Sequence, residues 1–142
     1  MLIKQSTVAL NPTTQKPPPA PLVDRIVIQR TVFFVDDRQD IRMLATPYLS
    51  LVPGITAHIL SNGRDALSAL ATVHPDVLVT DINMPEMTGF ELIKRARELY
   101  PDLKIVIFSA GIRESSKKEL ELQGIIVLDK SVGFDDLIKC LT

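Results

Sequence analysis

Five polar side chains follow short apolar segments, and together they are the kinds of group that phosphoryl transfer requires. Asp36 and Asp37 follow one such segment, Asp81 follows another, and Ser109 and Lys130 end two more. Carboxylates bind hard divalent cations, and an ionised carboxylate can itself attack phosphorus without a general base. A single aspartate after a strand is as readily explained as a helix N-cap. Five such residues at four strand ends predict a functional site.

The charges of this group predict a bound cation. Two unit charges about 4 Å apart repel by roughly 4 kcal/mol at an effective dielectric constant near 20. Lys130 can offset one of three carboxylates, and a divalent ion can offset the rest. Mg²⁺ suits a site with few carboxylates and several waters. The site contains no histidine or cysteine, which argues against zinc or copper.

The elements that must position these residues are visible as alternating apolar runs and helical spacings. The expected strands are Thr31–Val35, Ile55–Leu60, Val77–Thr80, Lys104–Phe108 and Ile125–Leu128. The expected helices are about Arg38–Leu51, Gly63–Val73, Phe90–Leu99, Glu114–Gln123 and Phe134–Leu141. Strands that are apolar on both faces and alternate with helices predict a parallel sheet covered on both sides. We therefore expect an α/β fold, a doubly wound five-stranded parallel sheet with flanking helices, which binds ligands at the carboxyl ends of its strands.

The rest of the composition narrows the domain organisation and the class of partner. Residues 1–24 hold five of the ten prolines and are expected to form a proline-rich disordered tail, which leaves 25–142 as one domain. The net charge of −1 gives no reason to expect direct contact with nucleic acid or an anionic membrane. No apolar run approaches the ~20 residues that span a bilayer. A single cysteine fits a reducing compartment, so we expect a cytoplasmic protein.

Four stretches carry a resemblance to a known family. FFVDDRQDIR (33–42), VLVTDINMPEMTGFELI (77–93), IVIFSAG (105–111) and LDK (128–130) resemble the receiver domain of two-component response regulators, of the chemotaxis-regulator type. The resemblance covers about residues 30–142. The D-x-x-M-P-x-x-x-G pattern that begins at Asp81 is its most specific part. It implies a flavodoxin-like sheet with strand order 2-1-3-4-5.

The resemblance also implies a role for each residue of the acidic group. Asp37 would be a direct Mg²⁺ ligand, and Asp36 would act largely through water. Asp81 would be both the phosphoacceptor and a further ligand. The backbone carbonyl of Asn83 would complete the protein's share of the metal site.

Other positions of the motif receive supporting roles by the same resemblance. Ser109 would hydrogen-bond the phosphoryl group, and Lys130 would pair with it. Pro85 and Gly89 would shape the loop, with glycine permitting a tight turn before a helix that opens at Phe90.

The implied function is that of a signalling phosphoacceptor in a two-component system or phosphorelay, rather than an enzyme. The phosphoryl donor would be a phosphohistidine on a sensor histidine kinase or phosphotransfer protein, and the output would pass to a downstream effector protein. We expect no DNA-binding output domain in this chain.

Two positions depart from the family pattern. Most relatives have proline after the lysine at the end of the fifth strand, often in a cis peptide bond, whereas here Ser131 follows Lys130. A non-proline cis bond costs about 2.5–4 kcal/mol, so we expect a trans path that aims Lys130 differently. Many relatives also carry an aromatic switch residue at the position of Val127, and this coupling cannot operate here.

These departures keep a second class of function open, a binding module that uses the fold without phosphorylation. A haloacid-dehalogenase-type phosphatase is disfavoured because Asp36-Asp37-Arg38 is not its D-x-D motif. A flavodoxin is disfavoured because the residues after the first strand do not form a Ser/Thr/Gly-rich phosphate loop.

Overall fold

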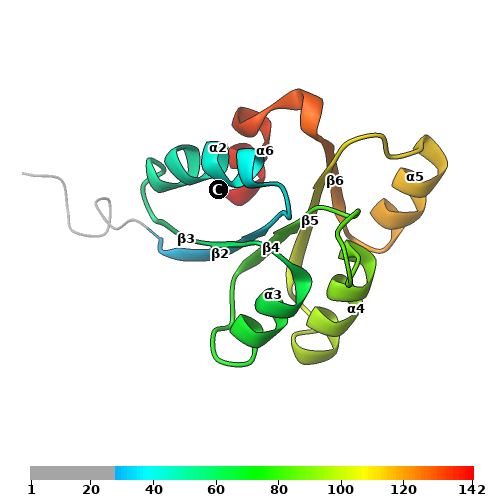
Figure 1. Cartoon of the computed structure of the whole chain (residues 1–142), viewed down its shortest axis with the longest axis horizontal. Coiled ribbons are helices and arrows are strands. Elements are labelled where there is room, and N and C mark those ends of the chain that lie inside the picture. The colour runs from blue at the N-terminus through cyan, green and yellow to red at the C-terminus, as the bar shows by residue number, and fades with distance from the viewer. Residues whose placement is uncertain (1–27) are drawn as a thin grey trace, which may run out of the picture.

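The structure is a computed structural model, and it describes residues 28–142 as a parallel sheet of five strands (Figure 1). The strands are β2 (Arg30–Val35), β3 (Ile55–Leu60), β4 (Val77–Thr80), β5 (Lys104–Ser109) and β6 (Ile126–Asp129). Their order across the sheet is β3-β2-β4-β5-β6, and all neighbouring pairs are parallel. This arrangement confirms the predicted fold class and the strand order 2-1-3-4-5.

Helices cover both faces of the sheet (Figure 1). One face packs against α2 (Gln39–Ser50) and α6 (Phe134–Leu141), and the other packs against α3 (Gly63–Leu70), α4 (Gly89–Leu99) and α5 (Glu114–Leu122). A short 3₁₀ helix, η3 (Lys130–Val132), links β6 to α6. Within residues 28–142, no helix combines the length and the apolar character needed to cross a bilayer. The predicted proline-rich tail lies outside the described residues.

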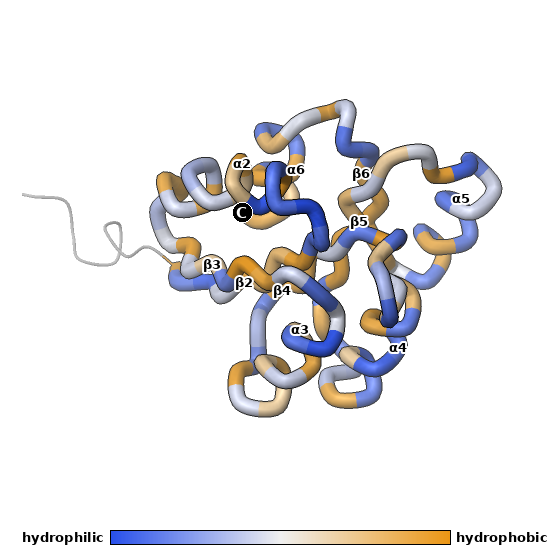
Figure 2. Tube along the Cα trace, viewed as in Figure 1, coloured by the Kyte–Doolittle hydropathy of each residue, from blue (hydrophilic) through white to orange (hydrophobic). Residues whose placement is uncertain are grey.

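Alternation along the strands builds a separate apolar core on each face. Figure 2 shows hydrophobic residues along the central strands that supply these cores. In β2, Val32 and Phe34 pack toward α2 and α6, while Phe33 and Val35 pack toward the opposite helices. All four are at most 1% exposed. The positions of β2 that are buried on the two faces are therefore all apolar, and its first carboxylate follows its carboxyl end.

Most predicted element boundaries lie within one or two residues of the observed ones. Helix α3 ends earlier than expected, at Leu70 instead of Val73. The chain there tightens into a turn in which the Thr72 amide donates to the Ala69 carbonyl, three residues back, at 3.1 Å. Strand β5 includes Ser109, and β6 includes Asp129. These two extensions place Ser109 and Asp129 side by side in the sheet register.

Candidate functional site

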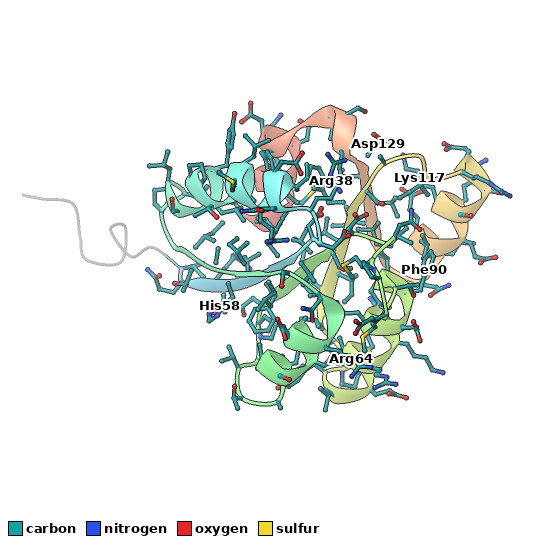
Figure 3. The ribbon with its side chains drawn as sticks, viewed as in Figure 1. Arg38, His58, Arg64, Phe90, Lys117 and Asp129 are labelled. Carbon is teal, nitrogen blue, oxygen red and sulfur yellow. The ribbon has the colours of Figure 1, made fainter. Side chains whose placement is uncertain are left out.

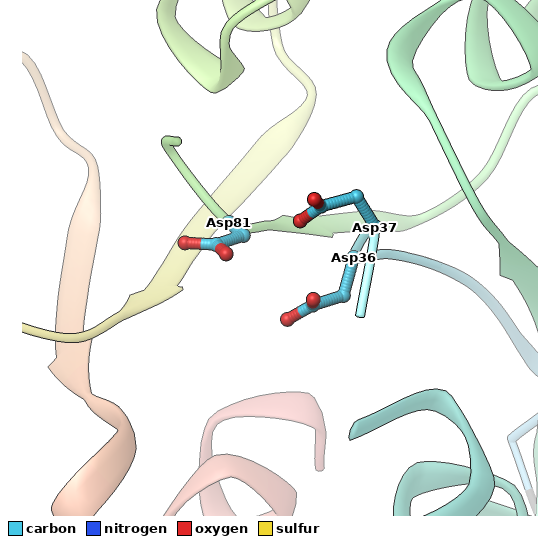
Figure 4. Close-up of side chains that lie close together, drawn as sticks. All are labelled: Asp36, Asp37 and Asp81. Atoms are coloured by element: carbon cyan, nitrogen blue, oxygen red, sulfur yellow. The ribbon is translucent and has the colours of Figure 1, made fainter. Parts of the chain in front are cut away.

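Three carboxylates meet where β2 and β4 end. Asp36, Asp37 and Asp81 each offer an oxygen that lies within 4.8 Å of the other two, and Figure 4 shows the three side chains gathered beyond the strand ends. We call this group the acidic pocket. The register explains the meeting, because Val35 pairs with Thr80 and each strand turns into its loop at the next residue. Asp36 is 1% exposed and Asp81 is 6% exposed.

Lys130 is the cation that the structure places in the acidic pocket. Its Nζ lies 2.7 Å from Asp36 Oδ2 and 3.0 Å from Asp81 Oδ2, and its side chain is only 15% exposed. No described peptide bond is cis, so the trans path predicted after Lys130 is confirmed. On this path the lysine still reaches the pocket, and it divides its charge between two carboxylates.

Burial and pairing act in opposite directions on the two partners. Burial raises the pKa of Asp36 above its usual value, although the contacts with Lys130 and the Arg38 amide partly counter this. Burial lowers the pKa of Lys130, but hydrogen bonds to Asp36 and Asp81 outweigh it and raise the pKa overall. The ammonium is therefore held charged, while one buried carboxylate is short of compensating charge.

Asp81 is the most fully anchored carboxylate of the pocket. Its Oδ1 accepts a hydrogen bond from the Ser109 hydroxyl and another from the Ile82 amide at 2.7 Å. Its Oδ2 accepts from Lys130 at 3.0 Å. Ser109 and Lys130 thus contact the two different oxygens of the Asp81 carboxylate. This agrees with the prediction that these strand-end residues gather at one edge of the sheet.

Asp37 and Asn83, the other two predicted metal ligands, lie in different surroundings. Asp37 is half-buried, and its Oδ1 is inaccessible and has no hydrogen-bond partner. Asn83 is exposed in the loop between β4 and α4, two residues beyond Asp81. The metal-binding role of its carbonyl stays a prediction.

The structure adds a residue that the sequence reasoning missed. The guanidinium of Arg42, on α2, donates to the backbone carbonyl of Asp36 at 2.9 Å. The amide of Arg38 donates to Asp36 Oδ1 at 2.9 Å, so the backbone and the side chain of this aspartate are both held. The available signal was an arginine in the second turn of a helix that follows an acidic pair.

Gly89 has a different role from the one expected. It is the first residue of α4, it is not among the glycines with positive φ, and a Cβ there would lie 2.1 Å from the Asp81 carbonyl oxygen. Glycine is needed because the helix start lies directly on the backbone of Asp81. The left-handed residue of this loop is Glu86, at φ 68°.

The start of α4 carries a capping box. Thr88 Oγ1 accepts from the Glu91 amide at 3.2 Å, and Glu91 accepts from the Thr88 amide at 3.1 Å. Its signal in the sequence is the Thr-x-x-Glu spacing of residues 88 and 91. The capping box fixes the helix whose first residue contacts Asp81.

The residues of the acidic pocket fit a magnesium ion. The donors are all oxygens, and the unpartnered Asp37 Oδ1 is a buried lone-pair site that protein groups leave unsatisfied. Three carboxylates against one ammonium leave a negative excess that a divalent cation would remove. Asp36, Asp37 and Asp81 are the side chains that would hold it.

Comparisons with known proteins agree with this geometry. The chain is 39% identical over 79 residues to the DNA-binding transcriptional regulator NtrC of Salmonella typhimurium, a match that covers 56% of this chain and 17% of NtrC. It is 35% identical over 92 residues to the autoinducer 1 sensor kinase/phosphatase LuxN of Vibrio campbellii, covering 65% of this chain and 10% of LuxN. The chain thus spans a small part of the curated relatives it matches.

A solved structure and a family model extend the match to the whole domain. The chemotaxis protein CheY4 of Vibrio cholerae superimposes with a TM-score of 0.71 at 30% identity, covering 80% of this chain and 96% of that one. The model of the response regulator receiver domain matches residues 32–142. Members of this family are signalling phosphoacceptors that carry a phosphoryl group on aspartate and bind Mg²⁺ in an acidic pocket. The chain belongs to the response regulator receiver domain family.

Proposed function

We propose that Asp81 accepts a phosphoryl group from a phosphohistidine on a sensor kinase or phosphotransfer protein, and that the modified domain signals to an effector protein. The observation that carries this proposal is the set of contacts on the Asp81 carboxylate. One oxygen meets a hydroxyl and a backbone amide, the other meets an ammonium, and two further acids lie within 4.8 Å. This surrounds one buried carboxylate with the groups that a phosphoryl group needs.

In the proposed step, a carboxylate oxygen of Asp81 forms a bond to phosphorus as the bond from phosphorus to the donor imidazole nitrogen breaks. The electron pair of that bond stays on the imidazole, which takes up a proton from solvent. Ser109 and Lys130 exchange their contacts with Asp81 for contacts with phosphoryl oxygens. Asp36, Asp37 and Asp81 would hold Mg²⁺, which when bound would neutralise negative charge on the transferred group.

The test is phosphorylation by a small donor, because phosphoramidate or acetyl phosphate supplies the phosphoryl group without a partner protein. With Mg²⁺ we expect the intact mass to rise by one phosphoryl group, and with EDTA we expect no rise. Asp81→Asn should remove the modification, while Asp102→Asn, at an exposed aspartate in a turn, should retain it. A wild-type chain that stays unmodified would favour the binding module without phosphorylation.

A separate prediction concerns the metal alone. Mg²⁺ binds only the folded pocket, so at ten times its dissociation constant it should raise the free energy of unfolding by about 1.4 kcal/mol. Asp37→Asn removes the unpartnered carboxylate and should abolish most of this gain, whereas Asp102→Asn should keep it. Urea unfolding with and without Mg²⁺ measures the difference. An equal gain in all three proteins would place the ion elsewhere.

A further inference from the structure

Asp129 is the last residue of β6 and directly precedes Lys130. Its carboxylate is exposed, yet its Oδ1 accepts the Ser131 amide at 2.9 Å and so caps η3. The bond closes over Lys130, the residue between donor and acceptor. A second bond, from the Gly133 amide to the Lys130 carbonyl at 3.2 Å, closes the turn on its other side. The backbone of Lys130 is thereby held on both sides.

The same carboxylate faces the loop that follows Ser109. Asp129 pairs with Ser109 in the sheet register, and Figure 3 labels it at the end of β6, on the side where Lys117 of α5 also lies. The amide and hydroxyl of Ser131 hold the pKa of Asp129 below its usual value, and the Gly111 amide and the charge of Lys117 add to this effect. An ionised carboxylate therefore contacts the turn that carries Lys130, and Gly111, in the loop that follows Ser109, contributes to keeping it ionised.

This fixation matters because Lys130 has a long, flexible side chain and two demanding contacts. Its Nζ must lie 2.7 Å from Asp36 and 3.0 Å from Asp81 at the same time. A shift of the backbone at Lys130 would change both distances unless the side chain moved to compensate. Ser131 supplies the amide that makes the cap, and a proline at this position would have no amide to donate.

We propose that Asp129 is a positioning residue for Lys130, and that the cap from Asp129 to the Ser131 amide aims the lysine at Asp36 and Asp81. For its effect on phosphorylation this inference rests on the function proposed above. Its structural part is independent of that function, because Lys130 pairs with the two aspartates in the unmodified domain.

The deciding experiment is a double-mutant cycle on stability, which needs no phosphoryl donor. Lys130→Met is made in the wild type and in Asp129→Ala, and all four proteins are unfolded in urea without divalent cations. If Asp129 positions Lys130, Lys130→Met should lower the free energy of unfolding in the Asp129→Ala background by less than half of what it costs in the wild type. If Asp129 only stabilises its own turn, the decreases in the free energy of unfolding caused by the two substitutions should add in full in the double mutant. This result would overturn the proposal.

A rate measurement extends the test to function. With phosphoramidate and saturating Mg²⁺, Asp129→Ala should be phosphorylated about five-fold more slowly, a factor in keeping with the loss of one cap. Asp129→Asn keeps an oxygen acceptor for the Ser131 amide and should recover most of the rate. Glu121→Ala, which removes an exposed carboxylate from α5, should behave as wild type. An unchanged rate in Asp129→Ala would contradict the inference, whereas an unmodified wild type would contradict the proposed function and leave the stability cycle to decide.

Discussion

Replacing Lys130 with methionine is expected to lower the free energy of unfolding by about 3 kcal/mol in the absence of divalent cations. Methionine keeps much of the apolar stem but removes the one ammonium or guanidinium group that, within residues 28–142, pairs with the carboxylates of Asp36 and Asp81. Both carboxylates are nearly inaccessible to solvent, so water cannot replace the lost partner. The matched control is Lys139→Met, because Lys139 pairs with Asp136 at 3.7 Å on an exposed surface. Such pairs contribute about 0–1 kcal/mol.

The pH dependence of this variant provides its own check. Burial already raises the pKa of Asp36 above 3.8, and loss of Lys130 removes the contacts that oppose the rise. A carboxyl group with a raised folded-state pKa loses stability as the pH climbs from its unfolded value through its folded value. The decrease in the free energy of unfolding caused by Lys130→Met should therefore be small near about pH 4 and should reach its full size near about pH 7. A deficit of the same size at both values would show that the ion pair is not its source.

The second large effect is expected at Gly89. On helix propensity alone, Gly89→Ala should stabilise the first turn of α4, since alanine is favoured over glycine by up to about 1 kcal/mol. The contact with the Asp81 carbonyl oxygen predicts the opposite sign, because a Cβ 2.1 Å from a backbone atom forces the helix and the strand end apart. We expect a loss of about 3 kcal/mol, at the upper end of overpacking costs, measured by urea unfolding.

Gly63→Ala is the matched control for this substitution. Gly63 is also the first residue of a helix, α3, and its added Cβ would meet the side chain of Met87, with the sulfur 2.8 Å away. A flexible methionine can move where a backbone carbonyl cannot, so we expect a change within about 1 kcal/mol. Equal losses at the two glycines would mean that crowding of the Asp81 backbone is not the cause.

The fold and the membership of the pocket followed from local patterns. An apolar run such as VLVT at 77–80 is short and rich in β-branched residues, so between helical spacings it predicts a buried strand, and parallel strands bring their carboxyl ends to one edge. Asp36, Asp81, Ser109 and Lys130 were therefore predictable as neighbours, and the structure brings them into contact. An error of one or two residues in a predicted strand boundary does not change which side chains lie at the end of that strand.

Contacts that depend on the three-dimensional path of a loop could not be predicted from local patterns. The close contact of Gly89 with the Asp81 backbone requires the path of the whole loop, and a turn-forming glycine was the wrong explanation. The bond from Arg42 to the Asp36 carbonyl joins a helix to the loop before it. Lys130 pairs with two carboxylates at once, and this depends on the turn that follows β6. From the sequence, we could predict only that the path of this turn differs from the family pattern.

The most direct test of the central claim is to identify the modified residue. After reaction with phosphoramidate and Mg²⁺, borohydride reduces an aspartyl phosphate to homoserine, and peptide mass spectrometry locates the change. Since Asp81 is the carboxylate that Ser109 and Lys130 both contact, we predict homoserine at position 81 and unmodified aspartate at positions 36 and 37. Homoserine at either of the other two positions, or at none of the three, would contradict the assignment of Asp81 as the phosphoacceptor.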